Sequence, residues 1–370
     1  MSSPTSSDDL PAIPGCDTII DLAVLKGDAL ESKVLKLVQV LFPDWAEGVE
    51  KITMERVSGA LTNAVFFINA ANKRRLLLRV YGNGVDQIID RENELAWLAR
   101  LSSLNIGPSL LGVFGNGRFE EYLPSTTLTH DDMCSPEISP RIASSLREIN
   151  DIVAVYPFDP TKDHLEVWTN IDKWYRVVMS LLPNLMNKSE GWSKVLEVYN
   201  LERLPFEIEE CKNILEKIHS PVVFAHNDTQ YGNVLQLENT KELVVVDFEY
   251  SGYNPRGYDL SNHFCEWAYD YHSDQPASMD MKKYPTYDQQ IRFLKAYLET
   301  PSKFDNPDIN DSVTPESLQK ESAMWLMAGH LAWGLWGLIQ ANQSEIDFDY
   351  FLYSTQRLNA FREDFAKWSL

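Results

Sequence analysis

Two short groups of polar residues in one stretch of the chain have the types and spacing to do chemistry. The tripeptide HND at 226–228 ends in Asp228, Asn233 follows five residues later, and an apolar run then leads into a DFE tripeptide that begins at Asp247. A carboxylate such as Asp228 can accept a proton from a hydroxyl nucleophile. Amide and carboxylate oxygens, such as those of Asn233 and Asp247, are the hard ligands that Mg²⁺ prefers. The stretch therefore contains a candidate base and two candidate metal ligands.

The order of these groups is typical of phosphoryl transfer. In an H-x-D-x-x-x-x-N loop followed by a β-branched strand that ends in D-F-x, the first aspartate faces the hydroxyl, while the asparagine and the second aspartate hold Mg²⁺ on the phosphates. Such a reaction depends mainly on positioning and charge neutralisation. One tripeptide of this kind would indicate only a turn. Two of them, in this order and separated by a strand, favour a phosphotransferase site.

The residues upstream read as strands around a loop. Strands are expected at about 52–57, 64–70 and 74–82, and the loop SGALTN lies between the first two. Backbone N–H groups of such a loop could cover anionic phosphate oxygens, although an ordinary hairpin turn would look similar. The loop residues predicted to contact ATP are Ser58, Gly59, Thr62 and Asn63.

Two further ATP contacts are expected in this part of the chain. Arg79 lies on the third strand, where a kinase-like small lobe carries its phosphate-contacting cation. A helix over 86–104 carries Glu92 and Glu94, either of which could pair with Arg79, and the sequence does not choose between them. Strands at about 109–114 and 118–124 follow, and Glu121 lies where adenine is expected at the junction of the lobes.

The whole pattern predicts a two-lobed α+β fold of the protein-kinase-like class. We expect a flexible leader over 1–17, a small strand-rich ATP-binding lobe over 18–123 and a large helical lobe over 124–370 that carries the catalytic and substrate-binding residues. A segment that is apolar on nearly every side, 321–340, should be a buried core helix rather than a membrane span. Helices are expected at about 28–40, 136–152, 171–187, 189–200, 204–219, 287–300 and 315–342.

Composition limits the function classes. The 370 residues include 33 Lys and Arg against 54 Asp and Glu, a net charge of −21, which disfavours nucleic acid or an anionic membrane as partner and suits a small cationic substrate. The four cysteines are scattered without a C-x-x-C pair, as in a cytosolic enzyme with reduced thiols. We expect a cytoplasmic protein, since neither a signal-peptide pattern nor an apolar run of membrane-spanning length is present.

Several longer segments resemble one family. FAHNDTQYGNVL, VVVDFEYSGYNPRGYDLSNHFCEWAYDY and HLAWGLWGLIQA are similar to the catalytic loop, metal loop and late tryptophan helix of the eukaryotic choline/ethanolamine kinases, and most like those of choline kinase. The resemblance runs from about residue 50 to the C-terminus. The small-lobe loop departs from it, because family members often have two adjacent glycines where this chain has Ser58-Gly59-Ala60.

The resemblance implies a choline kinase, a transferase that moves the γ-phosphate of ATP to the choline hydroxyl with Mg²⁺ and yields phosphocholine and ADP. This would be the first step of phosphatidylcholine synthesis, a phospholipid biosynthesis route through CDP-choline. Carried onto this sequence, the match implies Asp228 as base and Asn233 and Asp247 as metal ligands. It also implies supporting roles at the metal or the phosphates for Gln230 and Glu249.

The resemblance also implies a choline site. A trimethylammonium group has no N–H to donate, so aromatic faces and nearby carboxylates are the physical means of recognising it. The residues that match the family's choline site are Glu266, as an acidic wall, with Tyr271, Trp333, Trp336 and Tyr353. Tryptophans at helical spacing could also be ordinary core residues.

Four other polar residues are expected to be structural. In the proposed chemistry a carboxylate transfers the proton, so His263 and His330 should only support the fold. His226 should hold the catalytic loop by hydrogen bonds, and Asp259 should fix that loop rather than bind metal.

Alternatives stay open. An ethanolamine kinase or a dual choline/ethanolamine kinase is the nearest, and an inactive kinase-fold binding protein is one of another class, although intact Asp228, Asn233 and Asp247 argue against it. A protein kinase and an aminoglycoside phosphotransferase are disfavoured by the segments after the metal loop. Relatives in the family are often dimers, which makes a homodimer plausible. The sequence does not give the oligomeric state, the number of metal ions or the role of the leader.

Overall fold

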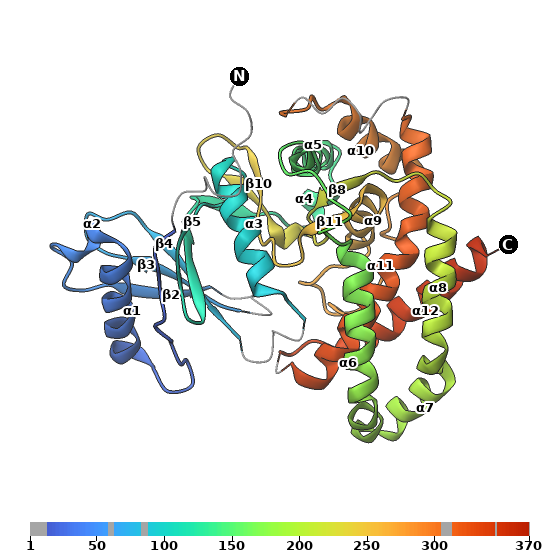
Figure 1. Cartoon of the computed structure of the whole chain (residues 1–370), viewed down its shortest axis with the longest axis horizontal. Coiled ribbons are helices and arrows are strands. Elements are labelled where there is room, and N and C mark those ends of the chain that lie inside the picture. The colour runs from blue at the N-terminus through green and yellow to red at the C-terminus, as the bar shows by residue number, and fades with distance from the viewer. Residues whose placement is uncertain (1–12, 58–62, 83–87, 305–312, 345, 370) are drawn as a thin grey trace. The chain divides into compact units, whose positions relative to one another are not determined.

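The structure is a computed structural model of the chain (Figure 1), and it describes residues 13–57, 63–82, 88–304, 313–344 and 346–369. The chain divides into two compact units. Unit 1 contains the described residues up to Ser125 together with Leu237–Thr240, and unit 2 contains Thr126–Gln236 and Lys241 onward. The predicted leader over 1–17 lies mostly outside the described residues, and the predicted lobe boundary at 123 stays a prediction.

Unit 1 is built on a six-stranded sheet with the strand order β1-β5-β6-β4-β3-β2. All of its pairs are antiparallel except that of β1 with β5. These strands are β1 (Gly15–Cys16), β2 (Thr53–Val57), β3 (Asn63–Asn69), β4 (Leu76–Tyr81), β5 (Leu110–Phe114) and β6 (Gly117–Glu121). Val, Ile, Leu and Phe dominate β3 and β4, as expected of strands that lie inside a sheet.

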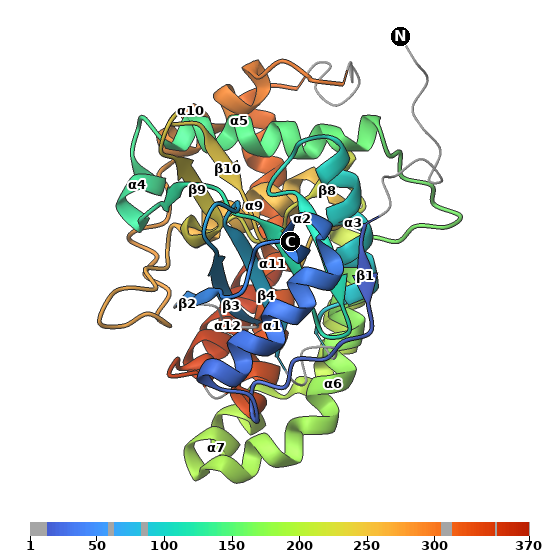
Figure 2. The same cartoon turned by 90° about the vertical axis from the view of Figure 1, so that its left-hand side faces the viewer.

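Helix α1 (Gly27–Leu41) lies along one face of this sheet (Figure 2). Its apolar residues recur at helical spacing and share a core with apolar residues of β3, β4 and β6, and α2 (Pro43–Ala46) follows with Trp45 in the same core. Helix α3 (Arg91–Ser103) begins later than the expected residue 86, because the side chain of Asp90 accepts from the backbone of Asn93 and caps the helix there.

Unit 2 is mainly helical, as predicted, and two small sheets hold its loops. One sheet pairs β8 (Val222–Ala225) with β11 (Gly252–Pro255), and the other has the order β10-β9-β7. The strands of the second sheet are β7 (Ser125–Thr127), β9 (Val234–Leu237) and β10 (Leu243–Val245). The helices are α4 (His130–Cys134), α5 (Ser139–Asn150), α6 (Glu166–Lys188), α7 (Glu190–Tyr199), α8 (Leu204–Leu215), α9 (Arg256–Glu266), α10 (Tyr287–Glu299), α11 (Pro315–Gln343) and α12 (Tyr350–Trp368), with short 3₁₀ turns at Asp151–Ala154, Leu201–Arg203 and Tyr231–Asn233.

Helix α11 is the central element of unit 2. It packs against α6, α9, α10 and α12 (Figure 1), and it is buried from Trp325 to Gln340, which confirms the prediction of a core helix. Two of its glycines allow α12 to come close. A Cβ atom on Gly334 would lie 2.7 Å from the Leu358 side chain, and one on Gly337 would lie 3.0 Å from Tyr353. Within the described part of the chain, no helix is long and apolar enough to cross a membrane.

Three helices of unit 2 were not predicted. Helix α4 is only five residues long, too short to show a helical repeat, and α9 is buried along its whole length, so its sequence RGYDLSNHFCE carries no alternation between a polar and an apolar face. Helix α12 contains Tyr353, which was predicted as a site residue but not as part of a helix. Helix α6 also begins at Glu166, five residues before the expected start at 171.

Candidate active site

The catalytic loop follows β8, and the carboxylate of Asp259 holds its backbone. Asp259 accepts from the backbone N–H of Asn227 at 2.7 Å and of His226 at 3.2 Å, and from the Asn150 side chain at 2.8 Å. Asn227 has φ of 70°, a left-handed conformation that asparagine adopts more readily than most residues. The prediction that Asp259 fixes the loop agrees with these contacts.

His226 joins the catalytic loop to the strand that precedes the second motif. Its Nε2 forms a hydrogen bond of 3.0 Å with the carbonyl of Val246, and the backbone N–H of Asp228 donates to its Nδ1 at 3.3 Å. Burial lowers the pKa of His226, so the ring is neutral at physiological pH. Burial likewise lowers the pKa of His263 to about 4, and its Nδ1 bonds to the carbonyl of Thr229. Both rings therefore support the loop.

The hairpin of β9 and β10 brings the two predicted metal ligands together. The strands pair antiparallel with Val234 opposite Val245, and the backbone N–H of Val246 donates to the carbonyl of Asn233 at 2.9 Å. Because Asn233 precedes β9 and Asp247 follows Val246, the hairpin ends with these two residues near each other. Asp247 has φ of 69°, a conformation that few residues other than glycine adopt and that occurs often at functional sites.

Asp228 lies beside Asn233 and among other carboxylates. The Asn233 side-chain N–H₂ group donates to the backbone carbonyl of Asp228 and to its carboxylate, both at 2.9 Å. Burial and the charges of Glu266, Asp247 and Glu249 raise the pKa of Asp228 well above its usual range, while the bond from Asn233 opposes this rise. The carboxylates of this group therefore need a cation near them to stay ionised together.

These residues fit a divalent cation. Asn233 uses its nitrogen for both bonds to Asp228, which leaves its amide oxygen as the atom that can bind a metal. With the carboxylate of Asp247 this gives hard oxygen ligands, and the local excess of negative charge has the sign that Mg²⁺ would neutralise. The donor set does not resemble the thiolate and imidazole sites of transition metals.

Two predicted supporting residues lie in the same motifs. The side-chain oxygen of Gln230 accepts from the backbone N–H of Gly232 at 2.7 Å and so caps the turn that leads to Asn233. A Cβ atom on Gly232 would lie 2.8 Å from that oxygen, so a larger residue there would displace the Gln230 side chain. Glu249 acts electrostatically on Asp228. Their predicted contacts with metal or phosphate stay predictions.

The residues predicted to bind choline meet in one aromatic cluster of unit 2. The ring centroids of Trp333 and Trp336 are 5.5 Å apart, and those of Trp336 and Tyr353 are 6.0 Å apart. Tyr271 joins the cluster through Tyr269, whose ring stacks on it at 5.9 Å and lies 5.1 Å from Tyr353. The structure therefore brings Tyr271 to the same cluster as Trp333, Trp336 and Tyr353, which lie far from it in the sequence.

Glu266 adds a charge to this cluster. Its carboxylate accepts from the hydroxyl of Tyr271 at 2.7 Å. Burial raises the pKa of Glu266, whereas the Tyr271 hydroxyl and the buried guanidinium of Arg357 lower it. The charge of Glu266 also raises the pKa of Asp228, so the carboxylates around Asp228 and the aromatic cluster are neighbours.

Three residues of the cluster were missed by sequence reasoning. Tyr250 accepts from Nε1 of Trp336 at 2.9 Å, and its ring lies 5.1 Å from that of Trp333. Tyr250 directly follows the DFE motif, and that position was a signal that could have found it. Phe348 lies 6.0 Å from Tyr353, and Trp174 of α6 lies 6.4 Å from Trp333. Neither of these two carries a signal in the sequence, because only the packing of the helices brings them to the cluster.

The predicted ATP contacts of unit 1 lie in or near a buried ionic network. Arg79 pairs with Glu120 at 3.1 Å, and Glu94 pairs with Arg118 at 2.8 Å and with Arg91 at 2.6 Å. Asn63 accepts from Arg91 at 3.0 Å, and Glu121 accepts from the hydroxyl of Ser109 at 2.7 Å. The loop residues Ser58, Gly59 and Thr62 lie outside the described residues. The predicted contacts of all these residues with ATP stay predictions.

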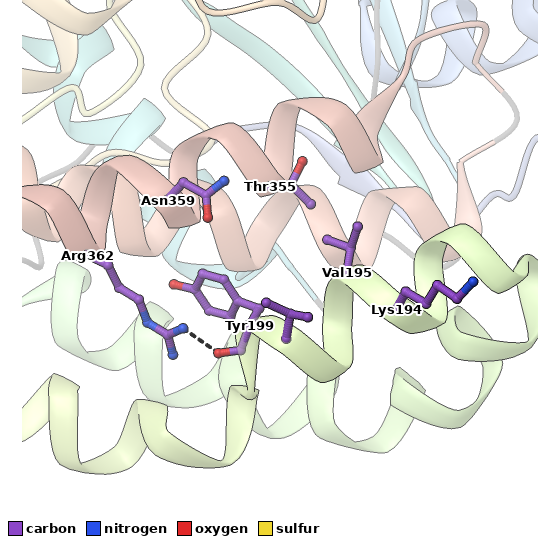
Figure 3. Close-up of a pocket in the computed structure, with 7 residues that line it drawn as sticks. Lys194, Val195, Tyr199, Thr355, Asn359 and Arg362 are labelled. Carbon is purple, nitrogen blue, oxygen red and sulfur yellow. Dashed lines mark hydrogen bonds between the residues drawn. The ribbon is translucent and has the colours of Figure 1, made fainter.

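A separate pocket of about 390 Å³ lies between α7 and α12 (Figure 3). It is lined by Lys194, Val195, Val198, Tyr199, Thr355, Asn359 and Arg362. Arg362 donates to the backbone carbonyl of Tyr199 across one end of it. The pocket contains none of the predicted site residues, although α12 also carries Tyr353, so it is distinct from the candidate active site.

The fold and the site define a phosphotransferase of the protein-kinase-like class, with an alcohol as acceptor. Within that class, the family profile described as choline/ethanolamine kinase matches residues 54–362, and the chain belongs to this family. This confirms the resemblance seen in the sequence and the expected fold class.

Individual relatives agree with this assignment. The chain is 34% identical to probable choline kinase 2 of Arabidopsis thaliana, over 90% of this chain and 91% of that protein. It is 32% identical to probable ethanolamine kinase of the same plant, over 97% and 91%. Among solved structures, an ethanolamine kinase of Plasmodium vivax has a TM-score of 0.74 at 24% identity and covers 92% of both chains, which supports the fold.

Proposed function

We propose that the chain is a choline kinase, which transfers the γ-phosphate of ATP to the hydroxyl of choline. The observation that carries this proposal is the aromatic cluster of Trp333, Trp336, Tyr353 and Tyr271, with Glu266 bonded at its edge. Aromatic faces attract a quaternary ammonium, and a carboxylate adds a countercharge without needing an N–H donor on the ligand. The same unit carries the predicted base, Asp228.

The residues of the catalytic loop have distinct tasks in this reaction. Asp228 accepts the proton of the choline hydroxyl as its oxygen attacks the phosphorus, and Asn233 fixes the Asp228 carboxylate by its hydrogen bond. Asn233 and Asp247 would hold Mg²⁺, which neutralises charge on the phosphates when it is bound. The hydrogen bond of His226 with the carbonyl of Val246 and the one that Asp259 accepts from the backbone of Asn227 keep the loop in place.

An ethanolamine kinase is the second candidate. The probable ethanolamine kinase of Arabidopsis thaliana is nearly as similar to this chain as the probable choline kinase is, so overall identity does not separate the two substrates. Ethanolamine carries N–H donors, so its site should depend more on carboxylates such as Glu266 and less on aromatic faces. The size of the aromatic cluster favours choline.

The wider context follows from the substrate. We infer a cytoplasmic enzyme that uses ATP and Mg²⁺ and supplies phosphocholine for phosphatidylcholine synthesis. A homodimer and the contact of Arg79 with ATP phosphates belong to the same proposal, and they rest on the resemblance to the family.

The experiment that tests the proposal is ADP release from Mg·ATP with choline or ethanolamine, measured in parallel for three proteins. The wild type should turn over choline faster than ethanolamine. Asp228→Asn should lose at least about 100-fold in kcat, since it removes the base. Asp131→Asn is the matched control on a fully exposed aspartate and should behave as wild type. Folded wild-type protein that binds ATP but phosphorylates neither amine would overturn the proposal.

A further inference from the structure

Tyr231 of the catalytic loop has contacts that the reaction itself does not explain. It stands between Gln230 and Gly232, in the short turn that leads to Asn233, and it is only 1% exposed. Its hydroxyl shares a hydrogen bond of 2.9 Å with Nδ1 of His272, a residue on the surface. A buried tyrosine whose hydroxyl reaches a distant segment ties two parts of the unit together.

The segment that Tyr231 reaches carries one wall of the proposed choline site. The ring of Tyr231 lies 5.9 Å from that of Tyr271, at an interplanar angle of 36°. Tyr271 in turn donates to Glu266 at 2.7 Å and lies 6.2 Å from Phe348. A continuous series of contacts therefore runs from the catalytic loop through Tyr231 and Tyr271 to the acidic edge of the aromatic cluster.

Tyr271 needs such support, because no helix or strand fixes it. Helix α9 ends at Glu266, and the chain from Trp267 to His272 consists of turns and irregular structure. His130 holds the start of this segment, with its Nε2 bonded to the carbonyl of Trp267 at 2.9 Å and its ring 6.2 Å from that of Tyr231. The Tyr231 hydroxyl holds the other end through His272.

We propose that Tyr231 is a positioning residue that sets the place of Tyr271, and through it Glu266, relative to the catalytic loop. The inference rests on the proposed function of this site as the ammonium-binding site. It makes Tyr231 a determinant of affinity for the amine, since Tyr271 contacts the cationic end of the substrate and Asp228 contacts the hydroxyl end. Loss of the hydrogen bond between Tyr231 and His272 should weaken amine binding and leave the chemistry at the phosphate unchanged.

The test is the split between KM and kcat in Tyr231→Phe, which keeps the ring and removes only the hydroxyl. We expect the KM for choline to rise about threefold to tenfold, as for loss of one hydrogen bond that holds a binding group. The kcat at saturating choline and the KM for ATP should stay within about twofold of wild type. Tyr253→Phe is the matched control, because it loses one hydroxyl bond, to the carbonyl of Tyr156, that is not part of the contacts between Tyr231 and Tyr271.

A second variant keeps the inference testable if Tyr231→Phe folds poorly. His272→Ala removes the partner from the surface and should raise the KM for choline by a similar factor, and the double variant should add little to either single one. A wild-type KM for choline in both single variants, or a fall in kcat without a change in KM, would overturn the inference and leave the kinase proposal intact. Absence of amine turnover in the wild type would overturn both.

Discussion

The buried glutamates of unit 1 and the acidic groups of the candidate site in unit 2 have opposite surroundings. In unit 1, Glu94 and Glu120 lie between arginines, and Arg118, which is wholly buried, bonds to both at 2.8 and 2.5 Å. The register of the sheet places Arg79 of β4 directly opposite Arg118 of β6. Like charges opposite each other repel, so the two glutamates are required between them.

In unit 2, the acidic groups of the candidate site lie beside one another. Burial and three other carboxylates raise the pKa of Asp228, and burial raises that of Glu266. Glu266 has the buried guanidinium of Arg357 near it, whereas the largest electrostatic effects on Asp228 come from carboxylates and from the Asn233 amide. Charges that are balanced within the chain stabilise a fold, whereas charges left to be balanced by a metal ion or an ammonium group prepare a binding site.

The largest effect expected from this difference is on the stability of unit 1. Arg118→Met should lower the free energy of unfolding by about 3–5 kcal/mol, because it leaves Glu94 and Glu120 buried with less opposing charge. Urea unfolding of the two proteins measures it. Lys194→Met, which breaks the exposed pair with Glu190, should cost less than about 1 kcal/mol. A loss in Arg118→Met as small as that of the control would mean that the network does not hold unit 1.

A change in the packing of α11 against α12 should have the next largest effect on stability. In Gly337→Ala the new methyl group meets Tyr353 and Ser354 at 3.0 Å, so α12 must move, at a cost of about 1–3 kcal/mol in stability. The KM for choline should rise as well, because Tyr353 moves away from Trp336. Thermal unfolding and amine kinetics measure the two effects.

Gly191→Ala provides the control for that variant. Gly191 lies in α7, where a Cβ atom would find only the Ser189 hydroxyl, at 3.7 Å. This change should stabilise the protein slightly, since alanine is the better helix former, and it should leave the KM for choline unchanged. Equal behaviour of the two variants would show that close packing of α11 and α12 does not shape the cluster.

How much of the molecule the sequence could predict depends on whether a feature is set by residues close in the sequence or by packing. The predicted base and the two predicted metal ligands lie within 20 residues of one another, so their spacing alone was informative. The strands of unit 1 and the helices with one apolar face, such as α1, were predictable for the same reason. These features depend on neighbours in the sequence.

Features that depend on packing were not predictable. The sequence offered Glu92 or Glu94 for Arg79, and it gave no sign of the pairs of Arg79 with Glu120 and of Glu94 with Arg118, which depend on the packing of strands and a helix. Helix α9 was missed because burial on all sides removes the amphipathic pattern. Trp174 joins the aromatic cluster only because α6 packs on α11.

A smaller effect should separate aromatic recognition from charge recognition. Trp336→Phe keeps a ring but loses the bond from Nε1 to the Tyr250 hydroxyl and part of the aromatic face. The KM for choline should rise roughly fivefold, or about 1 kcal/mol. The KM for ethanolamine should rise less, because its N–H groups can also bond to carboxylates. Trp192→Phe, which changes the stacked pair with Phe351, is the control. Equal changes for both amines in Trp336→Phe would argue against recognition by the ring faces.

The smallest expected effect is also the most direct test of the comparison. Asp228→Asn removes a buried carboxylate whose pKa is raised by burial and by its carboxylate neighbours, so without Mg²⁺ or ATP its melting temperature should equal or slightly exceed that of wild type, a change of no more than about 1 kcal/mol. Glu94→Gln is the same kind of change in unit 1 and should lower the melting temperature, since Arg118 and Arg91 lose their countercharge. Differential scanning calorimetry of both variants decides the matter. If Asp228→Asn were the less stable of the two, its carboxylate would be part of the fold's own balance of charge, and the distinction between a structural and a binding group of acids would fail.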